Sequence, residues 1–134
     1  MKIILNKDKL KKLTHNEKNL GFVPTMGSIH MGHLSLVKKC ISECDKSIVS
    51  IFVNKPQFNK KNDYKKYPRK LSRDIATLKK LKVDYLLIPK INEIYKNKKC
   101  MKVKIHKKDK VLCAKYRPGH FEGVLAVIKQ FLTN

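Results

Sequence analysis

The sequence has no tryptophan, few acidic residues and no long apolar stretch. Its 134 residues hold 10 Asp or Glu against 32 Lys or Arg, so the formal net charge is +22. No run approaches the ~18 apolar residues of a membrane span, and the N-terminus lacks the ~7–15-residue apolar stretch of a signal peptide. Apolar residues still make up 42% of the chain, enough to build a core. We therefore expect one cytoplasmic domain over residues 1–134, with no membrane partner.

Arginine is also scarce, and this bears on the meaning of the positive charge. Only Arg69, Arg73 and Arg117 accompany a large number of lysines spread along the chain. Proteins that read phosphates and bases through paired hydrogen bonds favour Arg. We therefore attribute the lysines to an A/T-rich genome and expect no nucleic-acid partner. A basic nucleic-acid-binding protein or a degenerate remnant remains an alternative, which a salt titration of DNA or RNA binding would distinguish.

The cysteines form no C-x-x-C pair, which argues against a zinc site or a redox motif. Cys40 and Cys44 are one helical turn apart, but two thiols do not complete a metal site. We expect reduced thiols and no bound metal. The other two cysteines are Cys100 and Cys113.

Apolar runs alternate with polar connections in the manner of an α/β fold. The run from 47 to 54 is rich in Ile and Val, which suits a strand buried on both faces. Alternating strands and helices favour a mostly parallel sheet flanked by helices. In such a sheet ligands bind where strands lead into helices. The predicted strands cover residues 20–24, 47–54, 84–89 and 101–106, and the predicted helices cover residues 34–44, 68–81 and 120–132.

The segment from Pro24 to His33 combines glycines with two histidines. His30 and His33 are three residues apart at a helix start, so their rings are expected on the same side. Two imidazoles there can donate hydrogen bonds to phosphate oxygens, and a helix N-terminus favours anions. The competing interpretation is a histidine pair that caps the helix without a ligand. Glycines on both sides of the pair favour a nucleotide-phosphate site.

These residues carry a resemblance to a known family. The pattern H-x-G-H after the first buried strand is the signature of the HIGH nucleotidyltransferase superfamily. GFVPTMGSIHMGHLSLV, SIFVNKPQF, YPR and RPGHFEGV then resemble pantothenate synthetase (pantoate–β-alanine ligase) in content and order. The resemblance implies a Rossmann-like nucleotidyltransferase domain that lacks the family's C-terminal domain.

The resemblance also implies a reaction and a set of site residues. ATP, carrying Mg²⁺, would activate pantoate as an adenylate, and the amine of β-alanine would then form the amide and release AMP. His33 would be the proton donor to the phosphates, and His30 would stabilise the same charge. The implied ATP-binding segment comprises Met26, Gly27, Ser28, Ile29, His30, Met31, Gly32 and His33.

Gln57 matches the family's glutamine that binds pantoate and lies near β-alanine. Asn54 is expected to line the same pocket, although a plain strand-end cap is an equally good interpretation. Arg117 would clamp a carboxylate or phosphate, or RPGH would simply turn the chain into the last helix. Tyr67 and Arg69 fall in the YPR block. The family resemblance further implies a homodimer.

The match departs from the family at two points. The order Lys55-Pro56 reverses the family's usual Pro-x before Gln-Phe, so the pocket loop is expected to differ. The later GEKD-x-QQ and S-S-R-N blocks, which supply a Lys and an Arg to the phosphates, are not found in these 134 residues. We therefore expect little ligase activity from this stretch alone, since one such donor is worth ~10²–10³ in rate. Another HIGH-type nucleotidyltransferase is the alternative, against which Gln57 discriminates.

Overall fold

The computed structural model describes residues 1–58, 60–96, 124, 126–129 and 131. The chain divides into two compact units. The first unit comprises Met1–Phe52 and Pro68–Lys90, and the second comprises Val53–Tyr67 and Ile91–Asn134.

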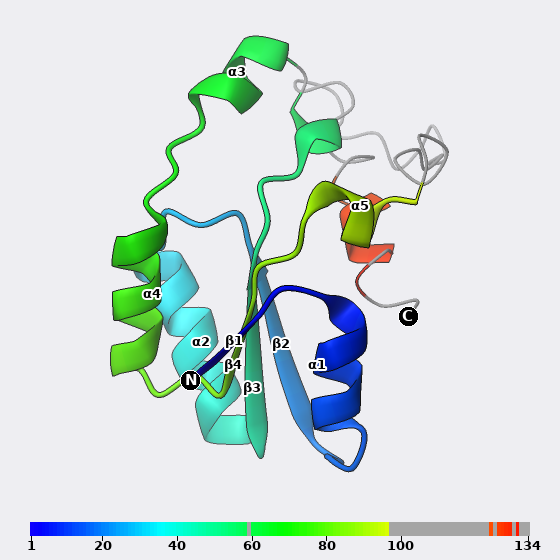
Figure 1. Cartoon of the computed structure of the whole chain (residues 1–134). Helices are drawn as coiled ribbons and strands as arrows, with labels where there is room; N and C mark the ends of the chain where they lie inside the picture. The colour runs from blue at the N-terminus through cyan, green and yellow to red at the C-terminus, as the bar shows by residue number, and fades with distance from the viewer. Residues whose placement is uncertain (59, 97–123, 125, 130, 132–134) are drawn as a thin grey trace, which may run out of the picture. The chain divides into compact units, whose positions relative to one another are not determined.

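The first unit is built on a four-stranded parallel sheet (Figure 1). Every adjacent pair of strands is parallel, and the strand order is β1-β4-β3-β2. β3 is buried along Ser47–Ile51, as its Ile and Val content predicts for a strand covered on both faces. The strands are β1 (Lys2–Ile4), β2 (Leu20–Thr25), β3 (Lys46–Ile51) and β4 (Tyr85–Leu87).

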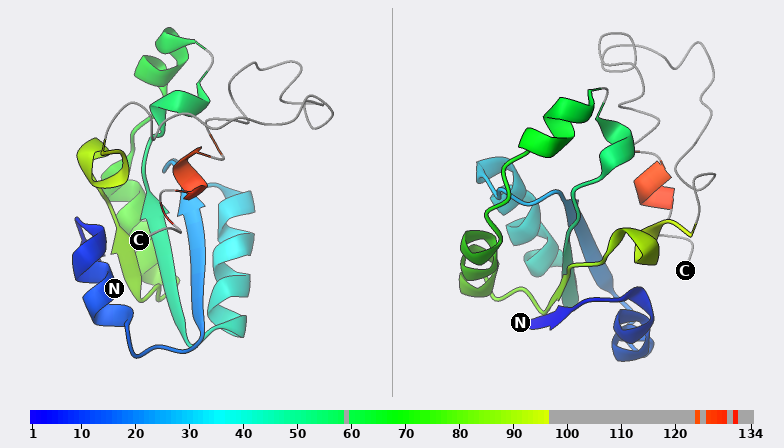
Figure 2. Two further views of the ribbon diagram at one scale, coloured as in Figure 1. Left: turned by 90° about the vertical axis from the view of Figure 1, so that its right-hand side faces the viewer. Right: turned by 45° about the horizontal axis from the view of Figure 1, so that its top comes forward.

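Helices cover both faces of this sheet. Figure 2 shows α1 (Lys7–Thr14) on one face and α2 (Met31–Glu43) on the other. α4 (Leu71–Lys80) shares one apolar core with α2, because Leu78 and Val37 are both fully buried in the same cluster. The core residues of this cluster are Val23, Val37, Val49, Ile51, Leu78, Val83 and Leu86. The predicted Rossmann-like α/β fold, a parallel sheet flanked by helices, is confirmed.

Pro24 does not end its strand as the sequence predicts. β2 continues to Thr25, and Pro24 stands opposite Ser50 in the register. The carbonyl of Thr25 accepts from the Phe52 N–H, so in the pleat the backbone of Pro24 turns to the other side of the strand. β2 is the outer strand of the four, and on that side a ladder donor is not needed.

The described part of the second unit is mostly short helices. They are the 3₁₀ turn η1 (Lys55–Gln57), α3 (Lys61–Lys66) and α5 (Ile91–Ile94). Residues 124, 126–129 and 131 are also helical, within the helix predicted for 120–132. α3 lies in a Lys/Asn stretch where no helix is expected. Its Asp63 in the first turn and its lysines in the last turn complement the helix dipole.

Other boundaries differ by a few residues from those predicted. α2 begins at Met31 rather than near 34, and α4 begins at Leu71 rather than at 68. β3 ends at Ile51 rather than at 54, and β4 is shorter than the predicted 84–89. The predicted strand 101–106 and Cys100, Cys113 and Arg117 lie outside the described residues.

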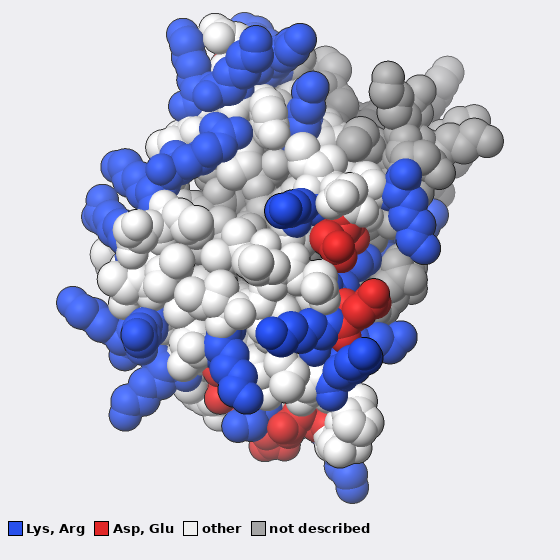
Figure 3. Space-filling model, in the orientation of Figure 1, with Lys and Arg blue, Asp and Glu red and all other residues white. Residues whose placement is uncertain are grey.

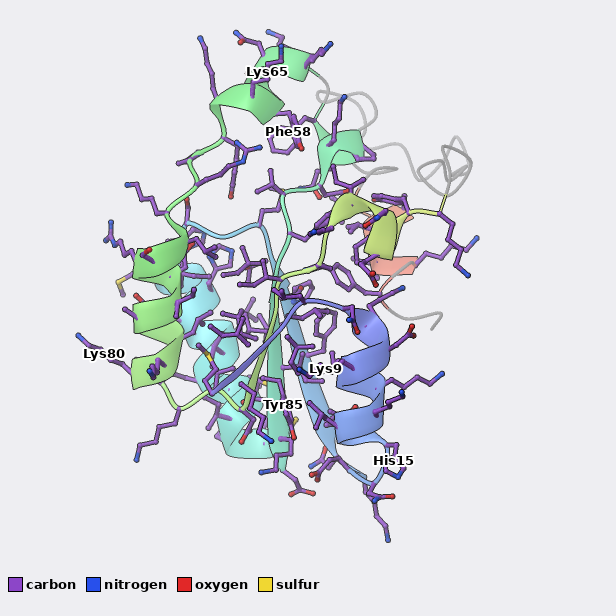
Figure 4. All side chains as sticks on the ribbon, viewed as in Figure 1. Lys9, His15, Phe58, Lys65, Lys80 and Tyr85 are labelled. Atoms are coloured by element: carbon purple, nitrogen blue, oxygen red, sulfur yellow. The ribbon has the colours of Figure 1, made fainter. Side chains whose placement is uncertain are left out.

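The surface of the described residues is basic over several elements. Figure 3 shows Lys and Arg at many separate places, over α1, α3 and α4. His15, at the end of α1, is exposed (Figure 4). No described helix has both the length and the apolar character needed to cross a bilayer.

Gly21 on β2 allows α2 to pack closely against the sheet. A Cβ at this position would lie 2.2 Å from the Cys40 Sγ and 2.8 Å from the Cys44 Sγ. We expect Gly21→Ala to lower the free energy of unfolding by about 1–3 kcal/mol, because the added methyl overpacks the contact. Urea unfolding followed by circular dichroism measures this loss.

Cys40→Ala should rescue part of that loss, because it removes the sulfur nearest to the added methyl group. The double variant Gly21→Ala/Cys40→Ala would then be more stable than the sum of the single changes predicts. Strictly additive losses would show that the two positions do not compete for space.

Candidate functional site

Side-chain hydrogen bonds hold the loop between β2 and α2 in place. The Thr25 hydroxyl donates to the Ser50 carbonyl (2.8 Å) and accepts from the Gly27 N–H (3.1 Å). The next two residues, Gly27 and Ser28, both have positive φ, at 79° and 49°. The Ser28 hydroxyl donates to the carbonyl of Pro68 (2.9 Å). The YPR block thus supports this loop through its proline carbonyl.

Asp74 completes the support of the loop. Its carboxylate accepts from the backbone N–H of Ser28 (2.8 Å) and of Ile29 (2.9 Å), one on each oxygen. Asp74 lies in the first turn of α4 and is only 2% exposed. Two bonds to a charged acceptor therefore tie α4 to the loop in front of α2.

His30 and His33 form a reciprocal cap at the start of α2. His30 is the N-cap, and its Nδ1 accepts from the Gly32 N–H (3.1 Å). The Nδ1 of His33 accepts from the His30 N–H (3.2 Å), and the ring centroids lie 3.9 Å apart. The expectation that the rings share one side is confirmed. The two histidines do cap the helix, and the cap uses both Nδ1 atoms.

This cap determines which ring nitrogens can meet a ligand. A nitrogen that accepts a hydrogen bond carries no proton, so each neutral ring has its proton on Nε2. Among the described residues neither Nε2 has a hydrogen-bond partner. His30 is exposed and His33 is half-buried. The pair therefore offers two Nε2–H donors while its Nδ1 atoms hold the helix start.

The second unit brings together Asn54, Gln57 and Tyr95. The Tyr95 hydroxyl donates to the Asn54 Oδ1, and the Asn54 Nδ2 donates to the Gln57 Oε1 (3.1 Å). All three residues are buried. Burial also raises the pKa of Tyr95, so its hydroxyl stays protonated. The link between Asn54 and Gln57 forms across η1, with Pro56 at its start, where proline is tolerated.

The same unit also contains a cluster of three aromatic side chains. Phe58 (Figure 4) makes edge-to-face contacts with Tyr64 and Tyr67, with centroid distances of 5.7 and 5.6 Å. The Lys55 ammonium lies 5.9 Å from the centroid of the Tyr64 ring. These contacts connect η1, α3 and the YPR block.

The structure thus places the predicted residues in two groups, one in each unit. His30 and His33 lie together, as do Asn54 and Gln57. Within the predicted segment Gly27 is buried and Met31 is 80% exposed. Arg117 lies outside the described residues. The site residues that sequence reasoning missed are Asp74 and Tyr95, whose partners are 45 and 41 positions away along the chain.

Comparison with known proteins decides the family. The sequence profile described as pantoate-beta-alanine ligase matches residues 2–134. The chain belongs to the pantoate–β-alanine ligase family. The pantothenate synthetase of Thermosipho africanus is 46% identical over 132 residues, covering 96% of this chain and 48% of that protein. That of Caldicellulosiruptor saccharolyticus is 47% identical over 122 residues, covering 91% and 43%.

Solved structures of pantoate–β-alanine ligases share the fold. The Francisella tularensis enzyme, complexed with beta-gamma ATP and beta-alanine, is 42% identical with a TM-score of 0.92, covering 98% of this chain and 52% of that chain. A Thermus thermophilus structure is 37% identical with a TM-score of 0.88, covering 97% and 47%. The chain spans about half the length of the curated relatives it matches.

The histidine cap at the start of α2 predicts how the stability of the protein changes with pH. The pKa of His33 is lowered by burial and then by His30, while Asp74 partly opposes this. Folding therefore favours neutral His33. Its contribution to stability should be complete above about pH 6.5, the ordinary pKa of histidine, and should be lost as pH falls through the lower pKa of the folded state.

The variant His33→Gln isolates this effect, because a Gln at the third helical position completes a capping box without titrating. Urea unfolding of both proteins between pH 5 and 8 measures the difference. We expect the wild type to lose stability relative to His33→Gln toward pH 5. A constant difference, or one that favours the wild type at low pH, would contradict the assignment.

Tyr95→Phe tests the buried network in the second unit. It removes the donor that Tyr95 gives to the Asn54 Oδ1, and loss of a partner for a buried polar atom costs about 1–3 kcal/mol. The matched control is Tyr85→Phe on β4 (Figure 4), another buried tyrosine, whose hydroxyl has no hydrogen bond among the described residues. We expect a clearly larger loss of unfolding free energy for Tyr95→Phe. Equal losses would exclude a role for the hydroxyl.

Proposed function

We propose that this chain takes part in the ATP-dependent ligation of pantoate to β-alanine through a pantoyl adenylate. The observation that carries the proposal is the His30–His33 pair, which presents two Nε2–H donors at the carboxyl end of β2. Parallel sheets bind ligands at this edge. Membership of the pantoate–β-alanine ligase family supports the reaction, and the beta-gamma ATP and beta-alanine named with the Francisella tularensis enzyme support the substrates.

The proposed reaction has two steps. A carboxylate oxygen of pantoate attacks the α-phosphorus of ATP, and the bond to pyrophosphate breaks. The amine of β-alanine then attacks the carbonyl carbon, loses a proton and expels AMP. Negative charge builds up on phosphate oxygens in the first step. Preorganised donors aimed at that charge lower the barrier, because they need no rearrangement as it develops.

The histidines would serve this step as hydrogen-bond donors. Their Nδ1 atoms are used by the helix cap, so each ring would meet the phosphates through Nε2–H. His33, which the resemblance implies as the proton donor, would thus act while neutral as a hydrogen-bond donor from Nε2–H, without transferring that proton. A lowered pKa suits this role, because a neutral ring keeps the cap intact. We propose that Met26–His33 contacts ATP mainly through these two rings.

Gln57 and Asn54 would bind pantoate in this scheme. The Gln57 amide offers both a donor and an acceptor to hydroxyl and carboxylate groups, and its Oε1 is oriented by Asn54. Arg117, carried over from the family, would add a carboxylate or phosphate contact.

We propose that Mg²⁺ enters with ATP as part of the substrate. Among the described residues, no group of three or more His, Cys, Asp or Glu side chains could hold a metal ion. A cytoplasmic location, a homodimer and one nucleotide-binding domain over residues 1–134 complete the proposal.

Calorimetric titration of the chain with ATP and with pantoate tests the function. The wild type should bind both ligands. Gln57→Ala should lower the affinity for pantoate by about tenfold or more, because a lost hydrogen bond of about 1.4 kcal/mol corresponds to a tenfold change in the dissociation constant. ATP binding should stay unchanged. The matched control is Asn62→Ala on α3, an exposed amide of the same unit.

Two outcomes would count against the proposal. If wild type binds ATP but not pantoate, another nucleotidyl transfer is indicated. If it binds neither, the nucleotide site is wrong. AMP release from pantoate, β-alanine and MgATP measures the ligase reaction itself, and we expect it to be slow for these 134 residues alone.

A further inference from the structure

We propose that Asp74 is the positioning residue of the histidine pair: its carboxylate fills the anion site of the loop Gly27–Ile29 and leaves the imidazole rings as the place for phosphate. This inference rests on the proposed ATP site.

The loop has the geometry of an anion site. Successive N–H groups in a turn can point toward one place, and such concavities bind anions. The chain turns at Gly27 and Ser28, which both have positive φ. The N–H groups of Ser28 and Ile29 converge on the Asp74 carboxylate at 2.8 and 2.9 Å. The site is therefore occupied by an anion that belongs to the chain.

The fit between the loop and Asp74 is tight. A Cβ on Gly27 would lie 3.0 Å from the Asp74 Oδ2 and 3.2 Å from the Ile51 Cγ2. Asp74 is 2% exposed, and each of its oxygens accepts one N–H. Burial and these bonds leave the carboxylate unsuited to proton transfer with a ligand. They suit it to holding backbone in place.

The hydrogen bonds from the Ser28 and Ile29 N–H groups to the Asp74 carboxylate, here called the clamp, hold the residue that precedes His30. Ile29 directly precedes His30, whose extended backbone (φ −127°, ψ −178°) places its Nδ1 on the Gly32 N–H. The same backbone directs the His30 N–H to the His33 Nδ1. Both ring positions therefore depend on where Ile29 is held. Asp74 also lies close enough to raise the pKa of His33, against the effects of burial and His30.

The experiment compares Asp74→Asn with Asp84→Asn. Asp84 is a matched control, because its carboxylate also accepts two hydrogen bonds, from the N–H and the hydroxyl of Ser47, at the amino ends of β3 and β4. Asn at position 74 keeps one acceptor but turns a donor toward the second backbone N–H. The change therefore disturbs the clamp with little change in side-chain size.

The first readout is the protonation of the ring nitrogens in the protein without ligand, by ¹⁵N NMR. Wild type and Asp84→Asn should show His30 and His33 with the proton on Nε2. Asp74→Asn should show a mixture of the two tautomers. The second readout is ATP affinity, which should fall about tenfold in Asp74→Asn, because small misplacements of binding groups are costly. Asp84→Asn should keep the wild-type affinity.

The two readouts separate this inference from the proposed function. If the ¹⁵N signals of the histidine rings are unchanged in Asp74→Asn, the inference is overturned, whatever the affinity for ATP. Failure of the wild type to bind ATP overturns the proposed function and the phosphate half of the inference, while the ring signals still decide the clamp.

Gly27→Ala tests the clamp from the loop side, since its methyl group would press on the Asp74 Oδ2 without removing the charge. It should give the same ring signals as Asp74→Asn. If both variants lose the folded circular dichroism spectrum while Asp84→Asn keeps it, Asp74 holds the fold rather than the rings, and the inference is wrong.

Discussion

The site in the first unit depends on one constraint: the backbone N–H groups at the β2–α2 junction must find acceptors. Each N–H from Gly27 to His30 is bonded to a side chain, supplied in turn by Thr25, by Asp74 twice and by His33. The Gly27 bond is buried and the two Asp74 bonds are partly buried. Unpaired N–H groups away from water cost free energy, so these acceptors fix the conformation of the loop. The positive φ angles at Gly27 and Ser28 persist because the surrounding bonds require them.

The loop between β2 and α2 differs from many glycine-containing loops in what its N–H groups bind. Such loops often bind phosphate with their own N–H groups and a helix N-terminus. Here a buried carboxylate takes two of the N–H groups, and the rings of His30 and His33 take two more. Imidazole differs from a backbone amide because its charge can change near neutral pH. The proposed phosphate site, made of rings, would therefore be sensitive to pH in a way that a site made of amides is not.

The sequence predicts those features of the fold and the candidate site that depend on residues close together in the chain. The Ile- and Val-rich run of β3 and the glycines near the histidines are visible in the sequence, and the parallel α/β fold follows from the alternation of strand-like and helix-like segments. The start of α2 is placed about three residues late, because its N-cap is a histidine rather than the usual Ser, Thr, Asp or Asn. α3 is missed because it is short and has no buried residue, so its sequence carries no apolar periodicity.

The two candidate groups show why the remainder is not visible in the sequence. Each contains a pair three residues apart, His30 with His33 and Asn54 with Gln57, and this spacing is apparent without a structure. Each pair or its loop is then held by a partner more than 40 residues away, Asp74 or Tyr95. In the sequence, Asp74 looks like an ordinary acidic residue of an amphipathic helix, and Tyr95 like an ordinary buried aromatic residue. Their roles arise from tertiary contacts, because a side chain that positions a loop needs no local pattern of its own.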